Sequence, residues 1–332
     1  MEVSLQEAAA LLKNANDIVI TAHENPDGDA VGSTLGLMHI LCDMGKKVQV
    51  MIDDDIPSNL FVLKGADGIV RPMERDAGIL VVLDTSLDRI GEVEKLVHAG
   101  KVLNLDHHRT NDMEAENVYV DSDSAATCEI VYRLASYLLP PVSDSEGDGL
   151  TAGCRLSSAM SKAAAMCLYT GLATDTGFFR FSNVTPDTLY AASELVASGA
   201  EPAVISESLE VRPWNYVQAL GKALATAELF DKGRIAGMFI DREIAGLTDD
   251  TGGFISQIRV VDGVDVAVVV KEKEEKICRV SMRSHGADVS RGAARSGGGG
   301  HIRAAGCTLN MTLPEAKNAI IAAIEDELAA EE

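Results

Sequence analysis

The chain has 332 residues, of which 46% are hydrophobic and 24% are charged, a composition typical of a globular protein long enough for two domains. Its net charge of −22 excludes strong binding of long polyanions, so any phosphate-bearing ligand must be small and held by a local cationic site. The sequence has no run as long as a membrane span, no signal-peptide pattern and no C-x-x-C pair, which predicts a cytoplasmic protein with reduced thiols and no membrane partner.

In the first half of the chain, short apolar strands alternate with helices. We expect strands over residues 18–20, 47–52, 78–83 and 101–105, and helices over 4–15, 30–44, 124–139 and 158–172. The continuous apolar run 78–83 is typical of a strand buried on both faces of a parallel sheet. The alternation predicts a doubly wound α/β fold with a mostly parallel sheet. A stretch rich in Gly, Ser and Asp over 143–155 indicates an exposed insertion.

The second half begins with helices and ends in a smaller mixed domain. Pro186, Pro202 and Pro213 each open a predicted helix, so residues 186–228 are interpreted as a helical connector. Strands follow over 235–240, 264–270 and 277–282, with a helix over 254–260 and a last helix after Thr312. The polar run 271–276 is predicted to be a hairpin turn. The predicted domains are therefore 1–185 and 229–332, joined by 186–228.

Carboxylate and imidazole side chains follow several of these strands and one helix. They are His23, Asp27, Asp29, Asp84, Asp106, His107, His108 and Asp175. Because the carboxyl ends of parallel strands share one edge of a sheet, we expect these groups to meet there. For residues 23–29 alone, a solvated Asp-rich turn is the alternative. The acidic run 53–55 is interpreted as a solvated loop, because three consecutive carboxylates point in diverging directions.

Two features of the second domain indicate an anion site. Arg283 and Ser284 end a predicted strand, and the run Gly297, Gly298, Gly299, Gly300 is followed at once by His301. Consecutive glycines expose backbone N–H groups that can hold an anion. The alternative is a flexible linker, but the flanking His301 and small apolar residues must pack, which favours a binding loop.

Together these motifs resemble those of the DHH phosphoesterase superfamily, and the stretch 297–306 resembles the signature of its companion DHHA1 domain. The likeness is greatest to the branch of bifunctional oligoribonucleases and 3′-phosphoadenosine-5′-phosphate (pAp) phosphatases. It covers nearly the whole chain in the family's order. The insertion 143–155 departs from the pattern but lies between the motifs.

The resemblance implies a role for each motif residue. One metal ion would be held by His23, Asp27 and Asp84, and a second by Asp29, Asp84, His107 and Asp175. Asp106 would orient a neighbouring ligand, and His108 would face the substrate phosphate. The substrate would be held from the second domain by Arg283, Ser284, His301 and the backbone of Gly298, Gly299 and Gly300.

The expected activity is Mn²⁺-dependent phosphoester hydrolysis, with Mg²⁺ or Co²⁺ as alternative metals. The oxygen-rich ligand set has two imidazoles and no thiolate, which disfavours structural zinc. Two cations can clamp the attacking and leaving oxygens of an in-line displacement, with a metal-bound hydroxide as nucleophile. The resemblance implies short oligoribonucleotides, linear dinucleotides and pAp as substrates. The sequence leaves the oligomeric state open, with a homodimer as one alternative.

Other members of the superfamily remain alternatives. A cyclic-dinucleotide phosphodiesterase could use the same site. A catalytically inactive nucleotide sensor is a different class, but every ligand position is filled. RecJ-type exonucleases fit less well because the first motif begins with His23 and 332 residues leave no room for an extra nucleic-acid domain. A family II inorganic pyrophosphatase would not need the glycine-histidine stretch.

Overall fold

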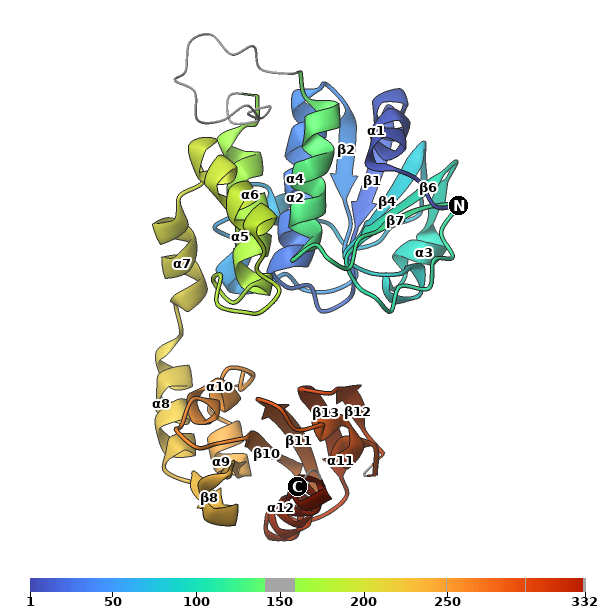
Figure 1. The fold of residues 1–332 in the computed structure, drawn as a ribbon. Coiled ribbons are helices and arrows are strands. Elements are labelled where there is room, and N and C mark those ends of the chain that lie inside the picture. The colour runs from blue at the N-terminus through green and yellow to red at the C-terminus, as the bar shows by residue number, and fades with distance from the viewer. Residues whose placement is uncertain (141–158, 249, 296, 331–332) are drawn as a thin grey trace. The chain divides into compact units, whose positions relative to one another are not determined.

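The computed structural model describes residues 1–140, 159–248, 250–295 and 297–330 (Figure 1), so the predicted insertion 143–155 lies outside the described residues. The chain forms two compact units, Met1–Val211 and Arg212–Glu332. The boundary between the units falls inside the stretch 186–228, whose role as a separate connector stays a prediction. Among the helices of the described ranges, none has the length and apolar character needed to cross a bilayer.

The first unit is built on a five-stranded sheet with the strand order β2-β1-β4-β6-β7. All neighbouring strands are parallel, which confirms the predicted fold class. The strands are β1 (Asp17–Thr21), β2 (Lys47–Val50), β4 (Ile79–Leu83), β6 (Val102–Asp106) and β7 (Asn117–Val120). β7 is not predicted from the sequence because this short segment carries no apolar run, and it forms by pairing with β6.

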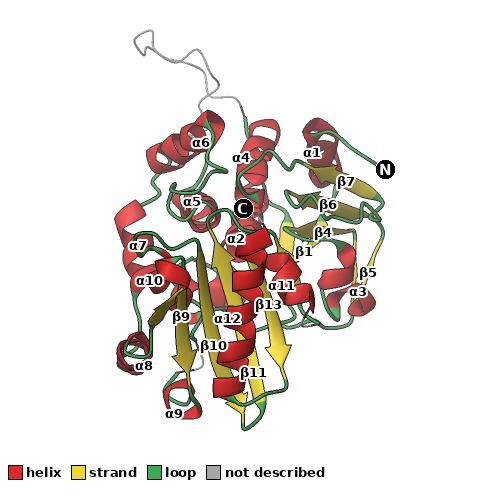
Figure 2. Ribbon diagram, turned by 60° about the horizontal axis from the view of Figure 1, so that its bottom comes forward, coloured by secondary structure: helices red, strands yellow, loops and turns green. Residues whose placement is uncertain are grey.

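Helices α1 (Leu5–Asn14), α2 (Gly28–Asp43) and α4 (Thr127–Leu138) cover one face of this sheet (Figures 1 and 2). Helix α5 (Lys162–Asp175) packs on α2 and α4, and α6 (Pro186–Ala197) and α7 (Pro202–Glu210) pack on α5. Ser4 and Glu7 form the capping box of α1. Ile18, Ile20 and Val81 pack against the helices in the largest core cluster. Burial of this apolar face is the main force that holds the sheet and the helices together.

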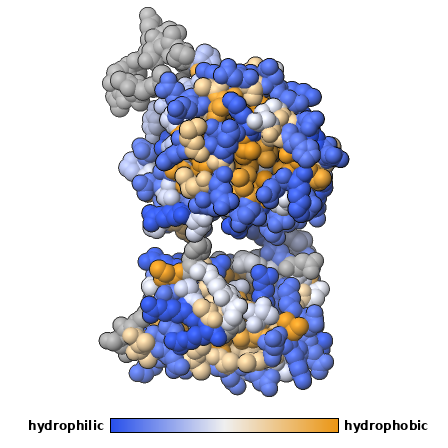
Figure 3. Space-filling model, turned by 90° about the vertical axis from the view of Figure 1, so that its right-hand side faces the viewer, coloured by the Kyte–Doolittle hydropathy of each residue, from blue (hydrophilic) through white to orange (hydrophobic). Residues whose placement is uncertain are grey.

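The other face of the sheet has a thinner cover. Val19, Leu80 and Val82 pack there in a smaller cluster. The cover consists of short elements: β3 (Arg75–Ala77), α3 (Val93–Leu96), β5 (Val97–Ala99) and the 3₁₀ turn η3 (Leu87–Arg89). The 3₁₀ turns η1 (Ser58–Leu60) and η2 (Ala66–Gly68) pack instead into the core cluster on the helix side. Apolar side chains also gather at the surface of the first unit on the side seen in Figure 3.

Helices α2 and α5 approach each other closely, and this approach places functional side chains. A Cβ atom at Gly32 would lie 2.6 Å from the backbone oxygen of Cys167, and one at Gly171 would lie 2.6 Å from Oδ1 of Asp29. Real Cβ atoms do not come so near, so glycine is required at both positions. The close packing brings Asp29 at the start of α2 beside Asp175 at the end of α5.

The second unit contains a six-stranded mixed sheet with the order β12-β13-β11-β10-β9-β8. Its strands are β8 (Glu228–Phe230), β9 (Ile235–Ile240), β10 (Val266–Glu274), β11 (Ile277–Ser284), β12 (Gly299–His301) and β13 (Ala304–Leu309). The other elements are α8 (Trp214–Leu224), η4 (Asp231–Gly233), α9 (Arg242–Ala245), α10 (Phe254–Arg259), α11 (Val289–Arg295) and α12 (Leu313–Ala330). One core lies between the sheet and α11 and α12, and another between the sheet and α8, α9 and α10.

The predicted hairpin between these strands is confirmed, but its turn is shorter than 271–276, because β10 continues to Glu274. Lys271 pairs with Arg279 and Glu272 pairs with Cys278, and a bulge follows before Ile277. Backbone pairing does not require apolar side chains, so the ladder continues beyond the buried part of the strand. As a result, Lys271 lies on the sheet and not in a loop.

Candidate active site

The first predicted motif lies where β1 leads into α2. Asp27 is the N-cap of α2, and its Oδ1 accepts hydrogen bonds from the backbone N–H groups of Asp29 and Ala30 at 3.0 and 3.1 Å. The Nδ1 of His23 lies 2.7 Å from the carbonyl oxygen of Glu24. A carbonyl can only accept, so Nδ1 carries the proton of the neutral ring, which leaves the lone pair on Nε2. That Nε2 lies 3.9 Å from Asp27 Oδ1 and 3.5 Å from Asp84 Oδ2.

Asp84 follows β4 at the centre of the sheet edge and is almost fully buried. Its backbone is left-handed, with a φ of 62°, a conformation that Asp tolerates better than most residues. The two oxygens of its carboxylate face different partners. Oδ2 faces His23, whereas Oδ1 lies 3.4 Å from Nε2 of His107. Asp84 is therefore shared between two groups of ligand atoms.

Asp106, His107 and His108 follow the next strand of the sheet, β6. The buried Oδ1 of Asp106 accepts the backbone N–H groups of His107 and His108, and it also lies 2.8 Å from His108 Nδ1. His108 is therefore held through Nδ1, and its side chain is 45% exposed. The Nδ1 of His107 lies 3.4 Å from the carbonyl oxygen of Ser124, which directs Nε2 toward the carboxylates.

Asp29 and Asp175 complete the cluster from two helices. The Nε2 of His107 lies 3.9 Å from Asp29 Oδ2 and 3.4 Å from Asp175 Oδ2. Asp29 is fully buried, and it accepts the backbone N–H groups of Thr127 and Cys128 at 2.6 and 2.9 Å. These donors form the first turn of α4, where the helix dipole favours a negative charge.

The pKa values of the two carboxylates that flank His107 shift upward because the cluster is buried and negatively charged. Burial, together with the charges of Asp84 and Asp175, raises the pKa of Asp29. Burial and the charge of Asp84 raise the pKa of Asp175 to about 7. Burial alone would also raise the pKa of Asp84, but the imidazoles of His107 and His23 beside its carboxylate hold that pKa below its usual range.

The imidazoles shift in the direction that adds positive charge. Burial opposes protonation of His23 and His107, yet the carboxylates around them raise their pKa values to about 9 and about 10. The hydrogen bond to Asp106 raises the pKa of His108. The negative charge of the cluster therefore attracts cations. When no metal ion is bound, protons on the imidazoles balance part of that charge.

The cluster fits divalent metal ions. The atoms in each of three groups lie within 4.8 Å of one another: His23 with Asp27 and Asp84, Asp29 with His107 and Asp175, and Asp84 with His107 and His108. The Nε2 of His107 is buried and has no hydrogen-bond partner among the residues that the structure describes. A buried polar atom seldom lacks one, and a metal ion would satisfy it. The first group is the predicted ligand set of one metal. The second group lacks only Asp84 from the predicted set of the other metal, and Asp84 Oδ1 lies 3.4 Å from His107 of that group.

Three residues that the sequence did not single out hold the cluster in place. Thr127 Oγ1 donates to Asp84 Oδ1 at 3.0 Å, and Asn111 Nδ2 donates to Asp106 Oδ2 at 2.6 Å. The buried Asn104 donates to the backbone oxygens of Val82 and Thr85, which fixes the turn around Asp84. Of these three residues, Asn104 could have been found from the sequence, because it is a polar residue inside an apolar strand.

The run 53–55 contributes no atom to these groups among the described residues. Asp53 accepts the backbone N–H of Glu92, Asp54 accepts that of Asn25, and Asp55 pairs with Arg71 at 2.5 Å. These carboxylates therefore hold neighbouring loops in place.

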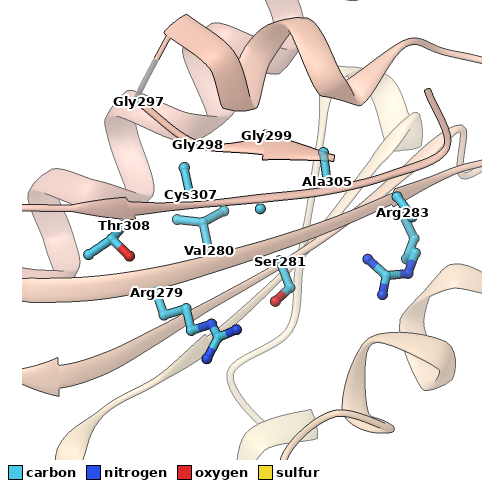
Figure 4. A pocket seen from close by; sticks show the side chains of 12 residues that line it. Arg279, Val280, Ser281, Arg283, Gly297, Gly298, Gly299, Ala305, Cys307 and Thr308 are labelled. Atoms are coloured by element: carbon cyan, nitrogen blue, oxygen red, sulfur yellow. The ribbon is translucent and has the colours of Figure 1, made fainter. Parts of the chain in front are cut away.

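The predicted anion site of the second unit contains a pocket of about 560 Å³ (Figure 4). Gly297, Gly298 and Gly299 line one side, and Arg279, Ser281 and Arg283 of β11 line another. Gly300 and His301 belong to β12, which pairs with β13. Ser284 lies apart from the pocket, because it is buried and its hydroxyl donates to the carbonyl oxygen of Ala287.

Comparison with known proteins identifies the family. The family model "DHH family, N-terminal domain" matches residues 17–172, and "DHHA1 domain" matches residues 242–330. The chain is 34% identical to the bifunctional oligoribonuclease and PAP phosphatase NrnA of Thermus thermophilus, over 94% of this chain and 90% of that protein. It is 26% identical to the cyclic-di-AMP phosphodiesterase PdeA of Listeria monocytogenes, over 97% of this chain and 49% of that protein.

A solved structure agrees with this assignment. An exopolyphosphatase-related protein from Bacteroides fragilis superposes with a TM-score of 0.85 and 26% identity, covering 99% of this chain and 97% of that chain. Both family models match in the order in which the two units occur, and the similarity to the Thermus protein spans nearly the full length of both chains. The chain therefore belongs to the DHH/DHHA1 phosphoesterase family, and it is a hydrolase.

Proposed function

We propose that this protein hydrolyses short oligoribonucleotides, linear dinucleotides and pAp with the help of two divalent metal ions, most favourably Mn²⁺. The observation that carries the proposal is the shared Asp84, whose Oδ2 faces His23 and whose Oδ1 faces His107. A carboxylate with its two oxygens in two ligand groups suits a pair of cations. The similarity to the Thermus oligoribonuclease and PAP phosphatase supports the choice of substrates.

The residues that would hold the metals are the ones that lie together. His23, Asp27 and Asp84 would hold one ion, and Asp29, Asp84, His107 and Asp175 the other. Four carboxylates carry four negative charges, which two divalent ions balance, so an anionic phosphate is no longer repelled. When bound, such a pair activates water as a nucleophile and stabilises the charge of an in-line displacement at phosphorus. Oxygen and imidazole ligands without thiolate favour Mn²⁺.

The protein's own groups would then orient the substrate and hold protons. Asp106 keeps His108 in position through Nδ1, so the exposed edge of the ring can donate from Nε2 to a phosphate oxygen. The Nδ1 protons of His23 and His107 are committed to the backbone oxygens of Glu24 and Ser124. These two imidazoles are therefore suited to ligation through Nε2, and not to proton transfer.

The second unit would bind the nucleotide. Arg283 offers two parallel N–H donors that match a phosphate, and the pocket beside it exposes the backbone of Gly297, Gly298 and Gly299. The net charge of −22 makes such a local cationic pocket necessary for any anionic substrate. Gly300 and His301 belong to the short strand β12 that follows Gly298, and we propose them as further substrate contacts.

A cyclic-dinucleotide phosphodiesterase is the second candidate. The chain resembles the Listeria enzyme over nearly all of its own length, but that enzyme is about twice as long. The higher identity and full-length match with the Thermus protein favour linear substrates. A non-catalytic sensor is disfavoured, because the predicted ligand positions hold Asp or His and their atoms lie close together.

The decisive experiment is a substrate panel with purified protein and Mn²⁺. The substrates are pAp, a linear diadenylate, RNA of 5 and 24 nucleotides, and cyclic di-AMP, with products resolved by length. We expect turnover of pAp and the diadenylate, and a rate that falls steeply with RNA length because the acidic surface repels long polyanions. Faster turnover of cyclic di-AMP, or equal rates on the 24-mer, would overturn the proposed substrate class.

A further inference from the structure

A second pocket adjoins the first on the sheet of the second unit. It has a volume of about 280 Å³ and shares Arg279, Ser281 and Arg283 with the pocket beside the glycine run. Lys271 and Lys273 of β10 add two further cations to its lining. Asp250 is the one acidic residue that the described part of the chain contributes to either pocket. In a chain with a net charge of −22, this is a concentrated patch of positive charge.

The row of polar side chains follows from the pleat of β11. Arg279, Ser281 and Arg283 alternate along the strand, so they lie on one face of the sheet. Figure 4 shows Ser281 between the two arginines, with both guanidinium groups on the same side. At a rise of about 3.3 Å per residue, the Cα atoms of Arg279 and Arg283 are roughly 13 Å apart. Long side chains at that separation can reach two anionic groups of one small molecule.

Two cations of the patch stand opposite each other in the sheet. Lys271 pairs with Arg279 in the register of β10 and β11. Lys271 is buried, and Thr251 is among its partners at 3.2 Å. Arg279 is exposed and forms no ion pair with a carboxylate of the described residues. An anion in this pocket would therefore meet an exposed guanidinium.

We propose that Arg279 and Lys273 form a second phosphate subsite, next to the pocket of Arg283 and the glycine run. Its ligand is a nucleotide with two phosphate groups, as in a nucleoside 3′,5′-bisphosphate or a 5′-phosphorylated dinucleotide. Arg283 binds one phosphate and Arg279 the other, with the Ser281 hydroxyl between them. The inference deepens the proposed function, on which it rests for the first phosphate. In this arrangement, Arg279 selects for ligands that carry a second phosphate.

Calorimetry on the full-length chain tests the subsite directly. AMP and pAp are titrated into the protein in EDTA, which prevents hydrolysis and leaves the residues of the subsite unchanged. The two ligands differ by one phosphate, so the ratio of their affinities reports the second contact. We expect the wild-type protein to bind pAp at least tenfold more tightly than AMP, because a charge-assisted contact is added.

Arg279→Ala should reduce that ratio to below threefold, while Arg279→Lys should keep part of it. Lys276→Ala is the matched control, since it removes an exposed positive charge from the same hairpin outside both pockets. The control variant should keep the wild-type ratio. An unchanged ratio in Arg279→Ala, an equal loss in Lys276→Ala, or equal wild-type affinities for the two ligands would each overturn the subsite.

Kinetics with Mn²⁺ separate this inference from the proposed function. A 5′-phosphorylated diadenylate should be preferred to its 5′-hydroxyl form, and Arg279→Ala should remove the preference through KM, with kcat little changed. If the wild-type protein hydrolyses neither dinucleotide, the proposed function fails, whereas the affinity ratio still decides the subsite. If both dinucleotides are hydrolysed equally well and Arg279→Ala changes neither, the subsite is wrong and the proposed function stands.

Discussion

The hydroxyl of Thr127 donates a hydrogen bond to Oδ1 of Asp84 at 3.0 Å, and the backbone N–H of the same residue donates to Oδ2 of Asp29 at 2.6 Å. Thr127 is fully buried at the start of α4. One residue therefore orients two carboxylates that belong to the same cluster. Nothing in the chain order indicates this link, because Thr127 lies 43 residues from Asp84 and 98 from Asp29.

Thr127→Val should weaken binding of Mn²⁺ and lower kcat/KM by about tenfold. Valine keeps the shape but removes the hydroxyl, and a hydrogen bond to a charged group contributes roughly 1.5–3 kcal/mol. Thr127→Ser should restore most of the activity. Thr170→Val is the control, because its buried hydroxyl donates to the backbone oxygen of Met166 and, within the described ranges, to no carboxylate. Metal titration of each variant by calorimetry gives a readout besides activity, and unchanged metal affinity in Thr127→Val would contradict the positioning role.

Asp84→Ala should abolish hydrolysis more completely than the loss of any other single ligand. Asp84 faces His23 through Oδ2 and His107 through Oδ1, so in the proposed two-metal arrangement its loss would remove a ligand from both metals. Metal stoichiometry and turnover should be measured side by side with Asp27→Ala, which should weaken one metal. Asp55→Ala removes a surface carboxylate and should behave as the wild type. Near-normal turnover of Asp84→Ala with added metal would exclude a two-metal mechanism.

Treatment with a chelator should remove the activity, and Mn²⁺ should restore it better than Zn²⁺ or Ca²⁺. The ligand atoms are carboxylate oxygens and imidazole nitrogens, a set that suits Mn²⁺. Initial rates after dialysis, with each metal added back over a range of concentrations, provide the measurement. Full activity of a preparation shown by elemental analysis to be metal-free would point instead to catalysis by the histidines alone.

Gly171→Ala should lower the melting temperature and impair metal binding together. The added Cβ atom would lie 2.2 Å from Cys128 Sγ and 2.6 Å from Asp29 Oδ1, so either the helices or the carboxylate must move. Overpacking of a core costs about 1–3 kcal/mol. Gly221→Ala in α8 is the matched control, because nothing lies within 4 Å of its added Cβ atom, and this variant should be neutral or slightly stabilised. Normal metal affinity in Gly171→Ala would show that Asp29 does not need this exact placement.

Arg283→Ala and His301→Ala should keep both metals and the fold but lose at least tenfold in kcat/KM on nucleotides. Removing one charge-assisted contact to phosphate accounts for this magnitude, roughly 1.5–3 kcal/mol. A small phosphoester such as p-nitrophenyl phosphate, which needs the metal cluster alone, should be affected less. Unchanged nucleotide kinetics would show that these two residues do not bind substrate. Loss of metal binding would show that the metal ligands are assigned wrongly.

The sequence by itself determined the sheet edge and most of the cluster. Strands β1, β4 and β6 are neighbours and parallel, so the residues that follow them meet at one edge, as predicted for His23, Asp84 and His107. The helix start at Asp27 is also local, because a side chain caps the N–H groups two and three residues ahead. Such features depend on chain order and short-range geometry, which a single sequence contains.

Only the tertiary structure decided which groups support that cluster. Asn111 on Asp106 and Thr127 on Asp84 depend on how loops and helices pack over the edge. The same holds for Ser284, which was predicted to bind substrate but is turned into the core, because adjacent strand residues face opposite sides of the sheet. The face that each residue presents follows from strand register and burial, and those are fixed by contacts between segments far apart in the chain.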